Sequence, residues 1–206
     1  MRHPNYQDSI VSVSKSILAF YDLYHHKDTQ NELDHILKKP FNHVILMLLD
    51  GMGQNLIDAH LDPQDFLKKH TIKTISSVFP PTTVAATNAV LAAKNPVETG
   101  YIGWTQYFKS IDKDAVVFLN EDFYTGEKIP FVIREKLLPY QSIIDQIKVK
   151  HQDVCATQLM PAFIKGGSKT FDEHLSKLTH VLSTSKKSFT YVYWTEPDET
   201  QHLKGV

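Results

Sequence analysis

The sequence HVILMLLDGMG, residues 43–53, decides the fold class. Val44 to Leu49 is a continuous apolar run of strand length, which is the pattern of a parallel strand covered on both faces. The run stops at Asp50, and Gly51 and Gly53 follow at once. A buried strand that ends in a carboxylate and a glycine turn predicts an α/β protein with functional groups beyond the carboxyl ends of its strands.

Strands and helices are predicted on both sides of this run. Upstream, apolar residues at helical spacing indicate an amphipathic helix from Asp8 to about His26, capped by Asp8 or Ser9 and packed on the outside of a sheet. The further expected helices are 55–69 with a break at Pro63, 84–94, 142–150 and 170–183, and the further expected strands are 71–79, 153–159 and 188–195. The aromatic-rich stretch 100–139 is expected to be irregular or a hairpin over the sheet edge. The fold class is therefore α/β, with a mostly parallel central sheet and helices on both faces.

The composition excludes several classes of protein. The 206 residues are 42% hydrophobic, which suits a compact globular domain. Lys plus Arg (22) nearly balances Asp plus Glu (23), so no global field favours nucleic acid or an anionic membrane. The single cysteine, Cys155, allows no internal disulfide, and the sequence shows neither a signal-peptide pattern nor a membrane span. We expect a soluble, cytoplasmic protein.

Three expected strands are each followed by polar residues that could act in catalysis or bind a ligand. Asp50 follows the first, Thr82 and Thr83 follow the strand that should end near Phe79, and Asp198 with His202 follows FTYVYW. Each segment also has an ordinary structural interpretation. Asp50 can be a helix cap or a turn residue, Asp198 can start a capped helix, and either threonine can be the cap of the Ala-rich helix.

The spacing of Asp198 and His202 puts both side chains on one face if Pro197 opens a helical turn. Carboxylate and imidazole are common zinc ligands and also bind manganese or iron. The Thr83 hydroxyl lies at a predicted helix start, where the helix dipole favours an incoming phosphate. The other histidines, His174 among them, lack ligand spacing and are expected mostly on the surface. A dinucleotide-binding domain is disfavoured, because the first strand is followed by an acidic residue and no GxGxxG.

Taken together, VILMLLDGMG, FPPTTVAATNAVLAAKNPVETGYIGW and YVYWTEPDETQH resemble the alkaline phosphatase superfamily, in particular its nucleotide pyrophosphatase/phosphodiesterase branch. The resemblance rests on the order and spacing of Asp-Gly after a strand, Phe-Pro-x-x-Thr, Gly-x-Ile-Gly and Glu-Pro-Asp-x-x-x-His, and it covers residue 41 to the end. Residues 1–40, outside the resemblance, are expected to be an N-terminal helical segment packing on the core. Residues 41–206 would then be the N-terminal part of an alkaline phosphatase-like catalytic domain.

The resemblance also implies roles for individual residues. Thr83 would be the nucleophile, forming a covalent phospho-threonine that is then hydrolysed. Asp50 would bind the metal ion that also contacts Thr83, and Asp198 and His202 would bind a second ion. Zinc is the expected metal, with manganese as an alternative. The substrate would be a phosphodiester or a nucleotide pyrophosphate bond; a phosphomonoesterase, a phosphonate hydrolase or a phosphomutase of the same superfamily remains open.

Two features depart from the family pattern. Trp104 stands after Gly-x-Ile-Gly, where the branch typically has Asn, and we expect Trp104 and Tyr107 to contact the substrate, a small phosphate ester or nucleotide. A further Asp-His pair and a later His of the family have no counterpart before Val206. We therefore expect an incomplete chain, and a catalytically incomplete fragment is the alternative to an active enzyme. Missing strands would leave an edge near Tyr191–Trp194 and favour self-association.

Overall fold

The structure, a computed structural model, describes residues 3–205. The chain folds into two compact units. Unit 1 is formed by Met1–Lys38 with Ile75–Gln146, and unit 2 by Lys39–Thr74 with Ile147–Val206. The sequence-based division near residue 40 stays a prediction. We describe each unit by itself.

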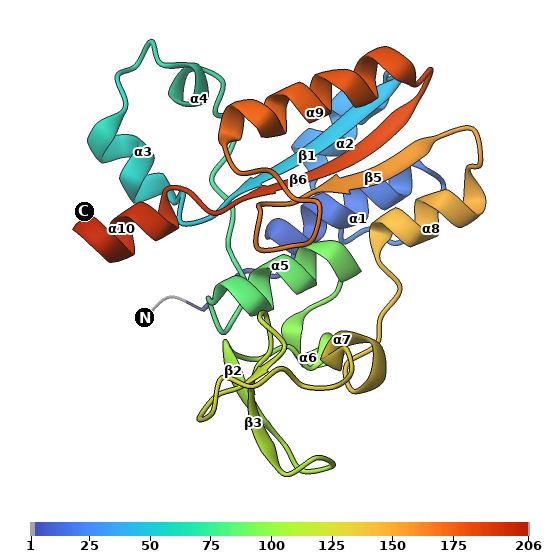
Figure 1. The fold of residues 1–206 in the computed structure, drawn as a ribbon. Helices are drawn as coiled ribbons and strands as arrows, with labels where there is room; N and C mark the ends of the chain where they lie inside the picture. The colour runs from blue at the N-terminus through green and yellow to red at the C-terminus, as the bar shows by residue number, and fades with distance from the viewer. Residues whose placement is uncertain (1–2, 206) are drawn as a thin grey trace. The chain divides into compact units, whose positions relative to one another are not determined.

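Unit 2 contains a parallel sheet in the order β1-β6-β5 (Figure 1). Its strands are β1 (His43–Leu49), β5 (Cys155–Leu159) and β6 (Ser188–Trp194). Both His43 and Cys155 are in register with Ser188, and both outer strands run parallel to β6. The carboxyl ends of the three strands therefore meet at one edge of the sheet, and the predicted α/β class with a parallel sheet is confirmed.

Helices flank this sheet. α9 (Phe171–Thr184) packs against β5 and β6, and it begins where the Thr170 hydroxyl accepts the Glu173 N–H at 3.1 Å (Figure 1). α3 (Gln54–His60), α4 (Phe66–Lys69) and α10 (Asp198–Lys204) also belong to unit 2. Across residues 3–205, no helix has the length and apolar character that a membrane crossing requires.

Two expectations about the sheet are wrong. β1 is not covered on both faces, because Ile45 and Met47 keep 40% and 38% of their surface exposed. The stretch Tyr191–Trp194 is not an edge either: β6 is the central strand, and its residues from Ser188 to Tyr193 are buried. Among the described residues the outer strands are β1 and β5. Self-association itself stays a prediction.

Unit 1 combines helices with a small antiparallel sheet. The helices are α1 (Ile10–Phe20), α2 (Asn31–Leu37), α5 (Thr83–Ala92), α6 (Pro96–Thr99) and α7 (Ile133–Lys136), and the sheet has the order β2 (Thr105–Phe108), β3 (Lys113–Val116), β4 (Glu121–Asp122). α8 (Ile143–Lys150) begins in unit 1 and ends in unit 2. The stretch 100–139 thus contains a hairpin, one of the two predicted alternatives, extended by a third short strand, and its expected place over the sheet edge stays a prediction.

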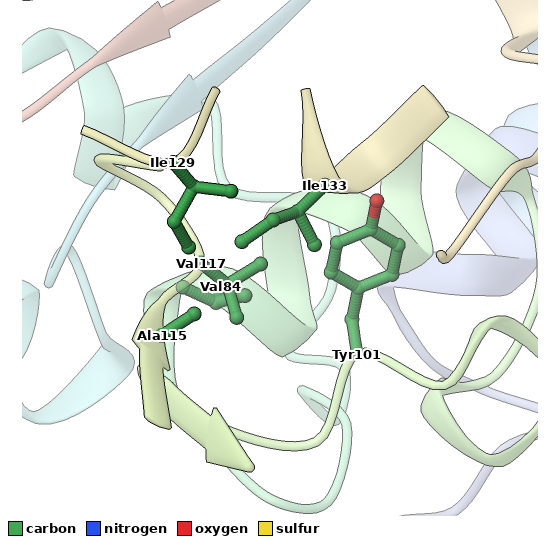
Figure 2. Packing of buried hydrophobic residues seen from close by; sticks show 6 residues of the cluster. All are labelled: Val84, Tyr101, Ala115, Val117, Ile129 and Ile133. Atoms are coloured by element: carbon green, nitrogen blue, oxygen red, sulfur yellow. The ribbon is translucent and has the colours of Figure 1, made fainter. Parts of the chain in front are cut away.

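A hydrophobic cluster fixes the start of α5. Figure 2 shows Val84, from the first turn of α5, packed with five residues of the segments that follow it: Tyr101, Ala115, Val117, Ile129 and Ile133. All six side chains are at most 9% exposed. Burial of this cluster holds the first turn of α5 against the antiparallel sheet.

The N-terminal helix is shorter than expected and packs on another helix of unit 1. Ser9 is its cap, but the helix ends at Phe20, because Asp22 takes a left-handed conformation with φ 55° and the Leu23 N–H turns back to Leu18 O at 2.8 Å. The expected packing of this helix on the outside of a sheet stays a prediction. Val11 is buried in a cluster with Ala85 and Ala89, so α1 packs on α5.

The strand predicted over 71–79 is absent. This segment has no ladder and makes only an isolated bridge, between Ser76 and Ser9. Ile72 is 67% exposed, so the alternating apolar pattern that suggested a strand does not bury one face. The polar residues Thr82 and Thr83 therefore follow an irregular segment, not a strand.

The prediction that His174 lies on the surface is wrong, because this residue is fully buried. It lies in the second turn of α9, with its ring 5.2 Å from that of Trp194 on β6. Neither imidazole nitrogen makes a hydrogen bond of good geometry with a described residue. Burial lowers the pKa of His174, and the neighbouring Lys177 lowers it further, while backbone groups of Leu159 and Tyr193 and the Glu173 carboxylate oppose the shift.

This burial predicts an acid-sensitive fold. Because the pKa of His174 is lower in the folded state than in the unfolded state, the neutral ring contributes its full stability above about pH 6.5, and that contribution is lost as the pH falls through the folded-state pKa. The slope of the unfolding free energy from this group approaches about 1.4 kcal/mol per pH unit. Urea unfolding between pH 7.5 and 5 is expected to show this loss in the unsubstituted chain and less of it in His174→Leu.

The matched control is His180→Leu, an exposed histidine on the same helix. This variant is expected to keep the pH dependence of the unsubstituted chain. An unchanged pH dependence in His174→Leu would show that His174 is not the responsible group.

Candidate active site

Asp50 directly follows β1 and is joined to the start of α10 by the backbone. Its N–H donates to Trp194 O at 3.0 Å, which extends the β1–β6 pairing, and its own carbonyl oxygen accepts the Asp198 N–H at 3.1 Å. Gly51, the residue after Asp50, turns the chain with φ 69°. A Cβ on Gly51 would lie 2.8 Å from Asp198 Cα, so only glycine allows this approach. The structure therefore brings two predicted metal ligands, Asp50 and Asp198, to one place.

Asp198 and His202 share one face of α10, as their spacing predicts. Pro197 precedes the helix, and Asp198 is its first residue. The His202 Nε2 lies 3.4 Å from Asp198 Oδ2, and the His202 side chain is 80% exposed. Asp198 itself does not cap this helix: the side chain that accepts an N–H of its first turn is Glu196, whose Oε2 accepts the Thr200 N–H at 3.0 Å.

The charges at this site favour a cation. Partial burial raises the pKa of Asp198, and the carboxylates of Asp50 and Glu196 raise it further, while His202 opposes the shift. Carboxylates and an imidazole are the kinds of donor that suit a divalent ion. Within residues 3–205, however, no three or more His, Cys, Asp or Glu side chains are gathered closely enough to hold a metal ion together. Asp50 and the Asp198–His202 pair thus form two partial ligand sets.

Sequence reasoning missed Tyr193. It lies near the end of β6, is 1% exposed, and its hydroxyl donates to Asp50 Oδ2 at 2.6 Å. Burial raises the pKa of Tyr193, and the hydrogen bond to Asp50 adds to the shift, so the phenol stays a donor at neutral pH. The only signal in the sequence is that Tyr193 lies in a predicted buried strand, where its hydroxyl needs a polar partner.

Thr83 is the first residue of α5 in unit 1. Thr82 is the cap, with its Oγ1 accepting the Ala85 N–H at 3.4 Å, so the alternative that the two threonines left open is settled in favour of Thr82. Thr83 is half-buried, and the first turn of this ten-residue helix carries no acidic residue. The dipole of α5 therefore favours an anion beside Thr83.

The Gly-x-Ile-Gly segment has a structural role in unit 1. Gly100 ends α6 with φ 77°, and a Cβ there would lie 2.9 Å from Leu138 Cδ2. Tyr101 is buried and donates its hydroxyl to Leu138 O at 3.1 Å. Asn88 is also held in the core, between Val84 O at 2.8 Å and the Tyr140 hydroxyl at 2.7 Å. The Tyr101 hydrogen bond fixes the loop that precedes Trp104, and the Asn88 hydrogen bonds hold α5 in the core.

Trp104 and Tyr107 both have accessible rings. The Trp104 ring stacks on Phe118, with centroids 5.7 Å apart and planes at 26°, and the residue is 44% exposed. Tyr107, on β2, is 58% exposed and donates its hydroxyl to Asp112 Oδ1 at 2.8 Å. Both rings therefore lie at the surface of unit 1.

Comparison with known proteins identifies the family. The family model described as type I phosphodiesterase / nucleotide pyrophosphatase matches residues 44–206. Neither curated proteins nor solved structures gave a match. The matched range includes every predicted site residue in both units. The chain therefore belongs to the type I phosphodiesterase/nucleotide pyrophosphatase family, a family of hydrolases.

Proposed function

We propose that this chain hydrolyses phosphodiester or nucleotide pyrophosphate bonds, with Thr83 as the nucleophile and two divalent metal ions, zinc or manganese, as cofactors. The family match supports the general activity. The observation that supports the site assignment is the backbone bond between Asp50 and Asp198, which joins the two partial ligand sets beyond the carboxyl end of a parallel sheet.

Asp50, together with Thr83, would hold one ion, and Asp198 with His202 would hold the other. When bound, such ions lower the pKa of an attacking hydroxyl and stabilise the charge on the phosphoryl oxygens. The first turn of α5 adds its backbone N–H groups and dipole beside the nucleophile, where a phosphoryl group carries negative charge.

The reaction follows from these roles in two displacements. Thr83 Oγ loses its proton and attacks phosphorus in line, the phosphorus–oxygen bond to the leaving group breaks, and a phospho-threonine ester forms. A water molecule then attacks the same phosphorus, breaks the ester bond to Thr83 and returns the hydroxyl. The exposed Trp104 ring would bind the base or another flat group of a small nucleotide-like substrate, with Tyr107 nearby on the same hairpin.

The substrate class can be tested directly. The chain is stripped with chelator, zinc or manganese is added back, and the rates on p-nitrophenyl thymidine 5′-phosphate and on p-nitrophenyl phosphate are compared. We expect the metal to restore hydrolysis and the diester to react faster. A faster monoester would instead identify a phosphomonoesterase of the same superfamily. No hydrolysis with either metal would contradict the proposal for this chain and identify a catalytically incomplete member.

A further inference from the structure

The hydrogen bond between Tyr193 and Asp50 links two strands at the candidate metal site. Tyr193 and Leu48 face each other in the β1–β6 register, so the tyrosine hydroxyl reaches past the end of β1 to the carboxylate two residues later. The O–O distance of 2.6 Å is that of a strong O–H donor to an ionised carboxylate. Both residues belong to unit 2, so this geometry is internal to one compact unit.

We propose that Tyr193 is a positioning residue, which holds the Asp50 carboxylate in the orientation that binds a divalent cation. This inference rests on the proposed function, since it assumes that Asp50 is a metal ligand. It adds a residue that the spacing of the motifs does not reveal, and it assigns that residue a measurable effect on metal affinity.

The carboxylate of Asp50 is held at both of its oxygen atoms. Oδ2 accepts the Tyr193 hydroxyl, and Oδ1 accepts the Gly51 N–H at 3.1 Å. Two donors on opposite oxygens restrict rotation of the carboxylate plane. A carboxylate oriented in this way loses less freedom when it binds a cation, and hydrogen bonds to ligands from surrounding residues are known to matter for metal affinity.

Tyr193 itself is rigid enough to act as such a support. It stands on the central strand of the sheet and is 1% exposed. The Phe163 ring packs edge-on against it, with centroids 6.5 Å apart and planes at 76°. The position of the hydroxyl is therefore set by the core of unit 2 rather than by a mobile surface side chain.

Zinc affinity measured by competition with a chromophoric chelator tests this role. Four proteins are compared: the unsubstituted chain, Asp50→Asn, Tyr193→Phe and Tyr191→Phe. Tyr191 is the matched control, because it is buried on the same strand and the same face, two residues away. Asp50→Asn defines which part of the binding belongs to this site. Thermal unfolding without metal shows whether each variant keeps its fold.

We expect Asp50→Asn to lose the site, Tyr193→Phe to bind zinc roughly 10–100-fold more weakly than the unsubstituted chain, and Tyr191→Phe to stay within about threefold of it. Equal affinity in Tyr193→Phe and the unsubstituted chain, with the site lost in Asp50→Asn, would overturn the positioning role and leave the proposed function standing. If Asp50→Asn binds like the unsubstituted chain, the metal role of Asp50 fails, and the inference fails with it. A Tyr193→Phe chain that does not fold would make Tyr193 a folding residue and would also overturn it.

Discussion

Replacing Thr83 with alanine is expected to lower phosphodiester hydrolysis by at least about 1,000-fold, because the variant has no hydroxyl to form the covalent intermediate. The fold should remain, since Thr83 is only half-buried and the cap of α5 is the neighbouring Thr82. The measurement is kcat on p-nitrophenyl thymidine 5′-phosphate with zinc or manganese restored, together with thermal unfolding of the same protein.

Thr82→Ala is the matched control for this prediction. It removes the Oγ1 that accepts the Ala85 N–H and is expected to cost about 1 kcal/mol of stability. It leaves the Thr83 hydroxyl in place, so activity is expected to fall by less than about tenfold at a temperature where the variant is folded. An inactive Thr82→Ala beside an active Thr83→Ala would show that the wrong threonine has been chosen.

Replacing Gly51 with alanine is expected to disrupt the meeting of Asp50 and Asp198. The new Cβ would lie within 2.9 Å of three Asp198 atoms, two of them backbone atoms, and φ 69° is unfavourable for any residue with a side chain. The two segments must move apart to relieve the contact. We expect a loss of at least about 2 kcal/mol in unfolding free energy and the loss of metal-dependent hydrolysis.

Gly53→Ala separates this effect from a general intolerance of the loop. A Cβ at Gly53 meets no atom within 4 Å, and its φ of −81° suits alanine. The control is therefore expected to keep both stability and activity. Urea unfolding and diester hydrolysis measure the two consequences. Equal behaviour of the two variants would mean that the close approach of Gly51 to Asp198 does not support the site.

Much of the parallel sheet could be predicted because its sequence signals are local. The apolar run before Asp50 is continuous, the segment SFTYVYW is rich in aromatic and β-branched residues, and both form strands of the same sheet. The four-residue spacing of Asp198 and His202 similarly predicts a shared helical face, and the structure places their side chains 3.4 Å apart. Such features depend on residues that are close in the chain, so the sequence contains the information.

The features that were missed depend on contacts between distant segments. Tyr193 meets Asp50 only because β1 and β6 are neighbours, and the order of the strands cannot be read from either strand alone. His174 has the sequence context of a surface helix, but α9 turns this residue towards Trp194. The segment 71–79 has the alternation of a strand but finds no neighbouring strand with which to form a ladder.

The central claim is that Thr83 carries the phosphoryl group during turnover. The most direct test is to quench the metal-restored chain in acid while it hydrolyses p-nitrophenyl thymidine 5′-phosphate, digest it and locate any adduct by peptide mass spectrometry. We predict a thymidine phosphate ester on Thr83, with p-nitrophenol as the released group. An adduct on another residue, or active turnover without any adduct on Thr83 at every quench time, would contradict the account.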